Sequence, residues 1–152
     1  MRNVLWIAAL ISTLLMVEFR PMDARLTGGK IIALEFAGTE GRARAMIESW
    51  GVSGLAGARA IQVRDSWWPW LYGVSLACAC LLAGGPGAAQ WAGASIVAVV
   101  FDLIENAGMN RMLAGDANQP WPALATLFAS IKFLLILAAL WHVLRRMWRK
   151  II

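Results

Sequence analysis

The stretch FDLIENAGMN, residues 101–110, places four polar side chains in a segment that is otherwise apolar. Asp102, Glu105, Asn106 and Asn110 follow each other at helical i, i+3 and i+4 spacing, which predicts that they share one face of a helix. The surrounding segment is apolar enough for a membrane, where each such group is costly. The stretch therefore predicts a membrane helix with a polar cluster inside it.

The composition indicates an integral membrane protein. Of the 152 residues, 60% are hydrophobic and 15% are charged, whereas soluble domains are about 45–50% apolar. Residues 66–101 contain no Asp, Glu, Lys or Arg, and a spanning helix needs roughly 20 mainly apolar residues. The net charge of +5 sits largely at the ends of apolar segments. We therefore expect the lipid bilayer as a partner, and no nucleic acid.

Four apolar segments predict an all-α fold, an integral membrane four-helix bundle that forms one domain over residues 1–152. Its spans are expected at about residues 3–19, 67–83, 88–113 and 121–144. The first segment has the basic start and apolar core of a signal peptide, but no A-x-A cleavage site follows. We therefore expect an uncleaved first span.

A mixed extramembrane loop is expected over about residues 20–66. Within it, KIIALEF (30–36) could be a short extended piece. Ala43, Met46, Ile47 and Trp50 fall on one helix face, which predicts an amphipathic helix. That helix could lie on the membrane or pack on the protein itself.

GVSG (51–54) is expected to end the amphipathic helix, and the chain then becomes helical again towards the second span. Ser66 is a candidate N-cap for that span, and Pro69 is tolerated in its first turn. The aromatic side chains at its start predict an interfacial belt. They are Trp67, Trp68, Trp70 and Tyr72.

The tail RRMWRK, residues 145–150, is basic and contains no acid. By the positive-inside rule it favours a cytoplasmic C-terminus, and with four spans a cytoplasmic N-terminus as well. The basic residues of the long first loop oppose this orientation. The expected location is a multi-pass position in a bacterial inner (plasma) membrane.

Lys132 is the only charge within the fourth span, and Asp102 lies at a matching depth in the third. Each is about ten residues from the short connecting loop, or roughly 15 Å at the rise of a helix. The two side chains are therefore predicted to meet. With Glu105 nearby, two carboxylates face one ammonium. We expect one acid, Glu105 in preference, to be protonated or solvated through a water-filled cavity.

The five polar residues Asp102, Glu105, Asn106, Asn110 and Lys132 form the candidate ligand-binding site. Ionisable groups in a membrane indicate function by default, and a small or lipophilic ligand is the favoured occupant. The alternatives are helix pairing in a non-enzymatic accessory or assembly subunit of a membrane complex, and a proton or ion pathway. Whether the protein is an enzyme stays open; the carboxyl pair could support proton transfer.

No cofactor or metal is expected, because the chain has a single histidine, His142, and no phosphate-loop, metalloprotease or haem-attachment motif. His142 could shuttle protons, but packing at the membrane surface is the favoured role. Cys78 and Cys80 point to different faces of a helix and are expected to be small buried residues.

The short motifs LEFAGT, D-x-x-E-N (Asp102, Glu105, Asn106) and K-F (Lys132, Phe133) resemble those of small bacterial four-span membrane proteins that have no assigned activity. The resemblance implies the four-span architecture. The span count and the acids inside the bundle are also loosely similar to the sterol-isomerase and sigma-2-receptor-like four-span families. Those families bind lipophilic ligands, and no catalytic residue of theirs can be placed here.

Overall fold

The computed structural model describes Leu26 and residues 30–151, and no strand occurs among them. Five helices follow one another in this part of the chain: α2 (Ile31–Glu35), α3 (Glu40–Asp65), α4 (Trp68–Ala83), α5 (Ala88–Leu113) and α6 (Trp121–Ile151). The prediction of an all-α chain is confirmed for these residues. The expected first span, 3–19, lies outside them.

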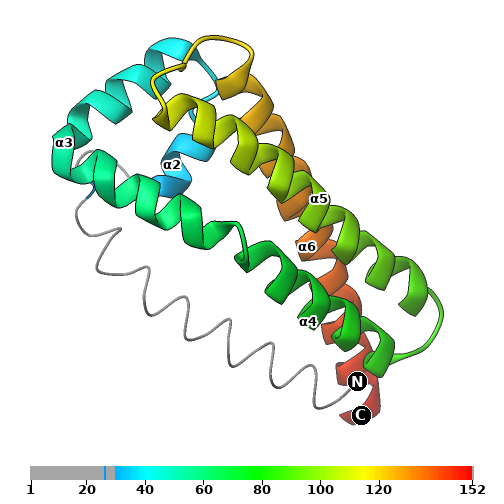
Figure 1. Cartoon of the computed structure of the whole chain (residues 1–152). Coiled ribbons are helices and arrows are strands. Elements are labelled where there is room, and N and C mark those ends of the chain that lie inside the picture. The colour runs from blue at the N-terminus through cyan, green and yellow to red at the C-terminus, as the bar shows by residue number, and fades with distance from the viewer. Residues whose placement is uncertain (1–25, 27–29, 152) are drawn as a thin grey trace.

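Helices α5 and α6 form a long antiparallel hairpin (Figure 1). Both are long and apolar enough to cross a membrane. Helix α5 has the bounds expected from the sequence, whereas α6 continues through the basic tail. Gly108 allows the close approach at their connected ends, because a Cβ there would lie 3.4 Å from the Trp121 carbonyl oxygen and 3.7 Å from Ala125 Cβ.

Helices α3 and α4 form a bent pair that follows α5 (Figure 1). They reach the length and apolarity of a membrane span only together, across a 40° bend. Helix α4 alone has 16 residues, fewer than the roughly 20 that a crossing needs. The segment 67–83, expected as a whole second span, therefore corresponds to α4, one part of the bent pair. The other part, α3, falls in the region expected as the extramembrane loop.

A second bend divides α3 at Gly51, which has φ 60° and ψ −170°. The expected break over 51–54 is thus confined to one glycine in the left-handed region, where residues with a Cβ are disfavoured. Before the bend, Ala43 and Trp50 are buried in a core that also contains Met109 of α5. The amphipathic face therefore packs on the protein itself, one of the two interpretations left open by the sequence.

Helix α2 corrects the expectation of an extended segment at 30–36. Leu34 is fully buried, and the Phe36 ring stacks on Phe133 of α6 at 5.9 Å. Thr126 Oγ1 donates a hydrogen bond to the Glu35 carbonyl oxygen at 2.8 Å. Packing against α6 thus outweighs the strand preference of the Ile31-Ile32 pair.

The start of α4 also differs from the sequence-based expectation. Ser66 does not cap it, because the Ser66 hydroxyl donates to the Gln62 carbonyl oxygen at 3.3 Å. Pro69 lies in the first turn as predicted. Trp67 and Trp70 are exposed, but Tyr72 turns inward to α5. The four aromatic side chains therefore do not form one belt.

We predict that Gly73→Ala destabilises the contact between α4 and α5. A Cβ at Gly73 would lie 2.1 Å from Val99 Cγ2, and the stiff Val99 side chain is fully buried. The expected loss is about 1–3 kcal/mol in the free energy of unfolding in detergent micelles. Gly93→Ala is the matched control, since nothing lies within 4 Å of its added Cβ. Equal stability of both variants would contradict this packing.

Candidate functional site

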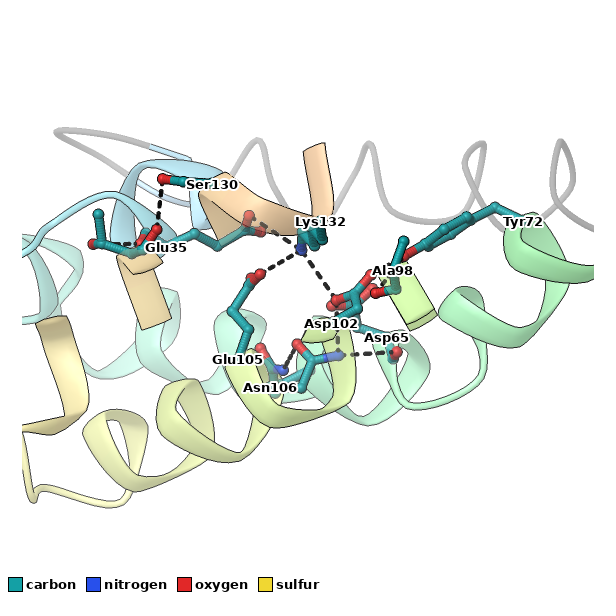
Figure 2. Close-up of polar contacts among 11 residues, drawn as sticks. Glu35, Asp65, Tyr72, Ala98, Asp102, Glu105, Asn106, Ser130 and Lys132 are labelled. Carbon is teal, nitrogen blue, oxygen red and sulfur yellow. Dashed lines mark hydrogen bonds and ion pairs between the residues drawn. The ribbon is translucent and has the colours of Figure 1, made fainter. Parts of the chain in front are cut away.

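Lys132 is the centre of a buried ionic cluster (Figure 2). Its Nζ lies 2.7 Å from Glu105 Oε2, 3.0 Å from Asp102 Oδ1 and 3.5 Å from Glu35 Oε2. The side chains of Lys132, Asp102 and Glu105 are 6%, 3% and 0% exposed. We call these four residues the acid–lysine cluster.

Three helices bring the cluster together. Asp102 and Glu105 project from α5 one turn apart, as their i, i+3 spacing requires. Lys132 comes from α6, and helical side chains tilt towards the N-terminal end of their helix. The ammonium is thereby directed towards the part of α6 on which α2 docks, and Glu35 supplies the third carboxylate from there.

Asp102 lies in the half of the cluster whose polar groups form hydrogen bonds with one another. Its Oδ1 accepts from Lys132 at 3.0 Å, and its Oδ2 accepts from the Tyr72 hydroxyl at 2.9 Å. Asn106 Nδ2 donates to Asp102 Oδ1 at 3.4 Å and to the Asp65 carbonyl oxygen at 3.3 Å, while Asn106 Oδ1 accepts from Gln62 Nε2. This network joins α3, α4, α5 and α6.

Glu35 and Glu105 form the other half, in which the carboxylates are held by ion pairs with Lys132. Both oxygens of Glu105 and Oε2 of Glu35 are buried without a hydrogen-bond partner, although each residue has an ion-pair contact with Lys132. In the cluster as a whole, three carboxylates face one ammonium. A charge excess of this kind is costly in a buried site unless protons or a cation compensate it.

Glu35 lies in α2, outside the helices that could cross a membrane. Burial raises the pKa of its carboxyl above the ordinary value of 4.5, and the nearby Lys132 ammonium opposes this only in part. The carboxyl of Glu35 therefore holds its proton to a higher pH in the folded protein than in the unfolded chain.

The structure bears out part of the predicted site geometry. The meeting of Asp102 with Lys132 is confirmed at 3.0 Å, and Glu105 and Asn106 are buried beside them. The placement of Asn110 is wrong, because its side chain is exposed. Asn110 lies eight residues after Asp102, which at 3.6 residues per turn places it about 80° around the helix from Asp102 and out of the buried face. The protonation of Glu105 stays a prediction.

The sequence did not reveal Glu35, Gln62, Asp65 or Tyr72 as members of the site. A signal existed for Glu35, which is the only charged residue between Lys30 and Glu40. A lone acid among apolar residues is a candidate for a buried contact. Gln62 and Tyr72 carried no comparable signal, because their role depends on the bend between α3 and α4.

The remaining candidates lie apart from the cluster. Cys78 and Cys80 are both free thiols. His142 is buried against Trp91, with 6.5 Å between the ring centroids. Within the described part of the chain, no group of three His, Cys, Asp or Glu side chains is arranged to hold a metal ion. In the acid–lysine cluster the positive charge comes from Lys132.

No family model, curated protein or solved structure matches this chain. The resemblance to small bacterial four-span proteins therefore stays an expectation that rests on short motifs. The interpretation of the site depends on its own geometry.

We predict that Lys132→Met destabilises the fold by about 3–5 kcal/mol at neutral pH, because it leaves buried carboxylates without their counter-ion. The loss should shrink at mildly acidic pH, where the Glu35 carboxyl holds its proton and needs no counter-ion. The measurement is the free energy of unfolding in detergent micelles. Arg145→Met is the control, since it removes a positive charge from an exposed position. A loss independent of pH would contradict the ionic role.

We predict that Glu35→Gln flattens the pH dependence of stability. Above pH 4.5 the unfolded chain loses the Glu35 proton while the folded protein keeps it, so wild-type stability falls as pH rises through this window. The variant has no proton to lose there. Unfolding curves at several pH values measure the effect. The control is Glu40→Gln, which removes an exposed acid paired with Arg44 and should leave the slope nearly unchanged.

Proposed function

We propose that this chain is an integral membrane protein whose acid–lysine cluster binds a small or lipophilic ligand that carries a positive charge. The membrane location is supported by α5 and α6, which are long and apolar enough to cross a bilayer. It is further supported by exposed apolar side chains along α6, such as Leu134, Leu137 and Leu144. Such a surface is stable in lipid and unfavourable in water.

The observation that carries the ligand proposal is the excess of acid beside Lys132. With all groups ionised, Glu35, Asp102 and Glu105 would outnumber the single ammonium, and a net charge at that depth is expensive. The atoms without hydrogen bonds in this part of the cluster are carboxylate oxygens. Carboxylates accept hydrogen bonds and attract cations, so the complementary ligand group is an ammonium or another cationic donor.

Binding would then be an exchange of cations. Without the ligand, a proton on one carboxyl group would lower the net charge of the cluster. A ligand ammonium that pairs with Glu35 and Glu105 takes over this role, and the displaced proton passes to solvent. The charge of the site is the same before and after the exchange. Ligand affinity is therefore expected to rise with pH until the ligand amine itself loses its charge.

Helix pairing in an accessory or assembly subunit is a second candidate, and the Asp102 half of the site favours it. There Lys132, Tyr72 and Asn106 satisfy the carboxylate, as expected of polar contacts that hold helices together. The Glu35 and Glu105 half does not fit this role, because buried acids that outnumber their counter-ion weaken a purely structural contact. A proton or ion pathway is less supported, since residues 66–101 contain no charged residue to continue it.

The orientation proposed is that the basic end of α6 lies on the cytoplasmic side of a bacterial inner membrane, in a multi-pass protein with both termini inside. The support is the cluster of Arg145, Arg146 and Arg149 with no acid after Lys132. A first span at 3–19 would complete a four-span bundle. The bent α3–α4 pair would serve as a broken span.

The test compares a fluorescent long-chain alkylamine with the uncharged alcohol of the same chain length. Wild-type protein in micelles should prefer the amine and release about one proton per amine bound, measured by calorimetry in buffers of different ionisation enthalpy. Glu105→Gln should weaken amine binding by about tenfold, or 1.4 kcal/mol. The control Glu40→Gln should bind as the wild type does.

Equal affinity for the amine and the alcohol would refute the proposed charge selection. Normal amine binding by a folded Glu105→Gln variant would show that the amine lies elsewhere. The thermal midpoint of each variant in micelles verifies that it is folded.

A further inference from the structure

The far end of α6 gathers positive charge without an acid. Arg145, Arg146 and Arg149 lie in its last turns, and the residues after Lys132 include no Asp or Glu. Helix α4, the turn after it and the first half of α5 pack beside this end and also lack acids. These elements therefore offer Arg146 no carboxylate with which to pair.

Arg146 nevertheless lies close to the turn between α4 and α5. Its guanidinium lies against Gly85 in the turn between α4 and α5, where an added Cβ would come within 2.3 Å of Cζ and 2.6 Å of Nε. The φ of Gly85 is +83°, so this position favours glycine on conformational grounds too. The Arg146 Nε is buried and has no hydrogen-bond partner. A planar donor group thus lies at the turn that leads into α5.

His142 precedes Arg146 by one helical turn and faces the same region. Its side chain is only 7% exposed, and its Nε2 is buried without a hydrogen-bond partner. The ring lies beside Trp91, which belongs to the first turn of α5. The Trp91 indole in turn lies against Gly87, whose added Cβ would be 3.4 Å from Trp91 Nε1. The imidazole is therefore turned towards the start of α5.

The start of α5 adds a positive dipole end. The helix has 26 residues and begins after Gly87, and no side chain caps its first turn. The N-terminus of a helix carries partial positive charge and backbone N–H groups that favour an anion. Arg146, His142 and this helix end thus converge on one region, and none of them brings a negative charge.

We propose that this region, made by Gly85, Trp91, His142, Arg146 and the N-terminus of α5, binds a phosphate group, and that its source is the headgroup of an anionic phospholipid. The Arg146 fork matches two phosphate oxygens, and His142 in its Nε2–H form gives a further donor. Trp141 and Trp148, both exposed on the last part of α6, fit the aromatic belt at a membrane surface.

The choice of a lipid as the source of the phosphate rests on the proposed membrane location of α6. The affinity of the site for a phosphate group does not depend on that location. The site is also independent of the acid–lysine cluster. Lys132 and Arg146 are separated by 14 positions in one helix, or roughly 21 Å at its rise. A failure of one proposal therefore leaves the other testable.

The experiment uses the full chain in lipid nanodiscs of phosphatidylcholine, to which fluorescent phosphatidylglycerol is added in trace amounts. Energy transfer from tryptophan to the labelled lipid reports its retention next to the protein. Arg146→Gln should lower the preference for phosphatidylglycerol by about tenfold, a change of 1.4 kcal/mol. Arg146→Lys should lose part of it, because lysine keeps the charge but not the fork. Amine binding at Glu105 should not change in either variant.

Arg145→Gln is the matched control, since it removes the same charge from the exposed neighbouring residue. An equally large loss in both variants would overturn the proposal, because it would indicate diffuse attraction to an anionic surface. Inorganic phosphate separates the two possible sources. If it binds the micellar protein in an Arg146-dependent way while phosphatidylglycerol shows no preference, the lipid assignment is refuted.

Discussion

A single ammonium group, that of Lys132, holds acids from two other helices in one buried place. Its contacts with Asp102 and Glu105 fix the register of α5 against α6, and its contact with Glu35 brings α2 to the same point. Because opposite charges in a low-dielectric interior attract strongly and are costly to separate, the other polar contacts are arranged around this one. Gln62, Tyr72 and Asn106 complete only the side that faces Asp102.

Hydrogen bonds therefore complete one side of the cluster and not the other, and the two sides differ in role. Where donors and acceptors are matched, the contacts are those of a scaffold, and they join four helices. Where acids exceed donors, the cationic ligand that we propose would pair with the carboxylates. Proteins commonly support a reactive or binding group by a well-packed neighbouring network, and Asp102 and Glu105, one helical turn apart, divide these tasks between them.

The hairpin and its central ion pair could be predicted from the sequence because both follow from local geometry. A constant rise per residue and a short loop place Asp102 and Lys132 at the same height, whatever surrounds them. The bounds of α5 followed from the glycine turn before it and the apolar run within it. Such features need no knowledge of distant contacts.

The contribution of Glu35 and the bent α3–α4 pair could not be predicted in this way. Residues 30–36 favour a strand by composition, and only docking on α6 makes five of them a helix. Residues 52–65 carry enough charge to look extramembrane, yet Gln62 and Arg59 turn to polar partners on α5, Asn106 Oδ1 and the Leu113 carbonyl oxygen. Gln62 is buried and Arg59 is exposed, and both contacts depend on tertiary partners that periodicity does not show.

The break between α3 and α4 explains the position of Asn106 in α5. When a helix stops beside apolar neighbours, its last carbonyl groups lose their usual partners, and in this chain Asn106 supplies a donor to that of Asp65. The side-chain amide of Asn106 in α5 thus lies at the level where the neighbouring α3–α4 pair is interrupted. A side-chain donor in one helix thus marks the level at which the neighbouring helix pair is interrupted.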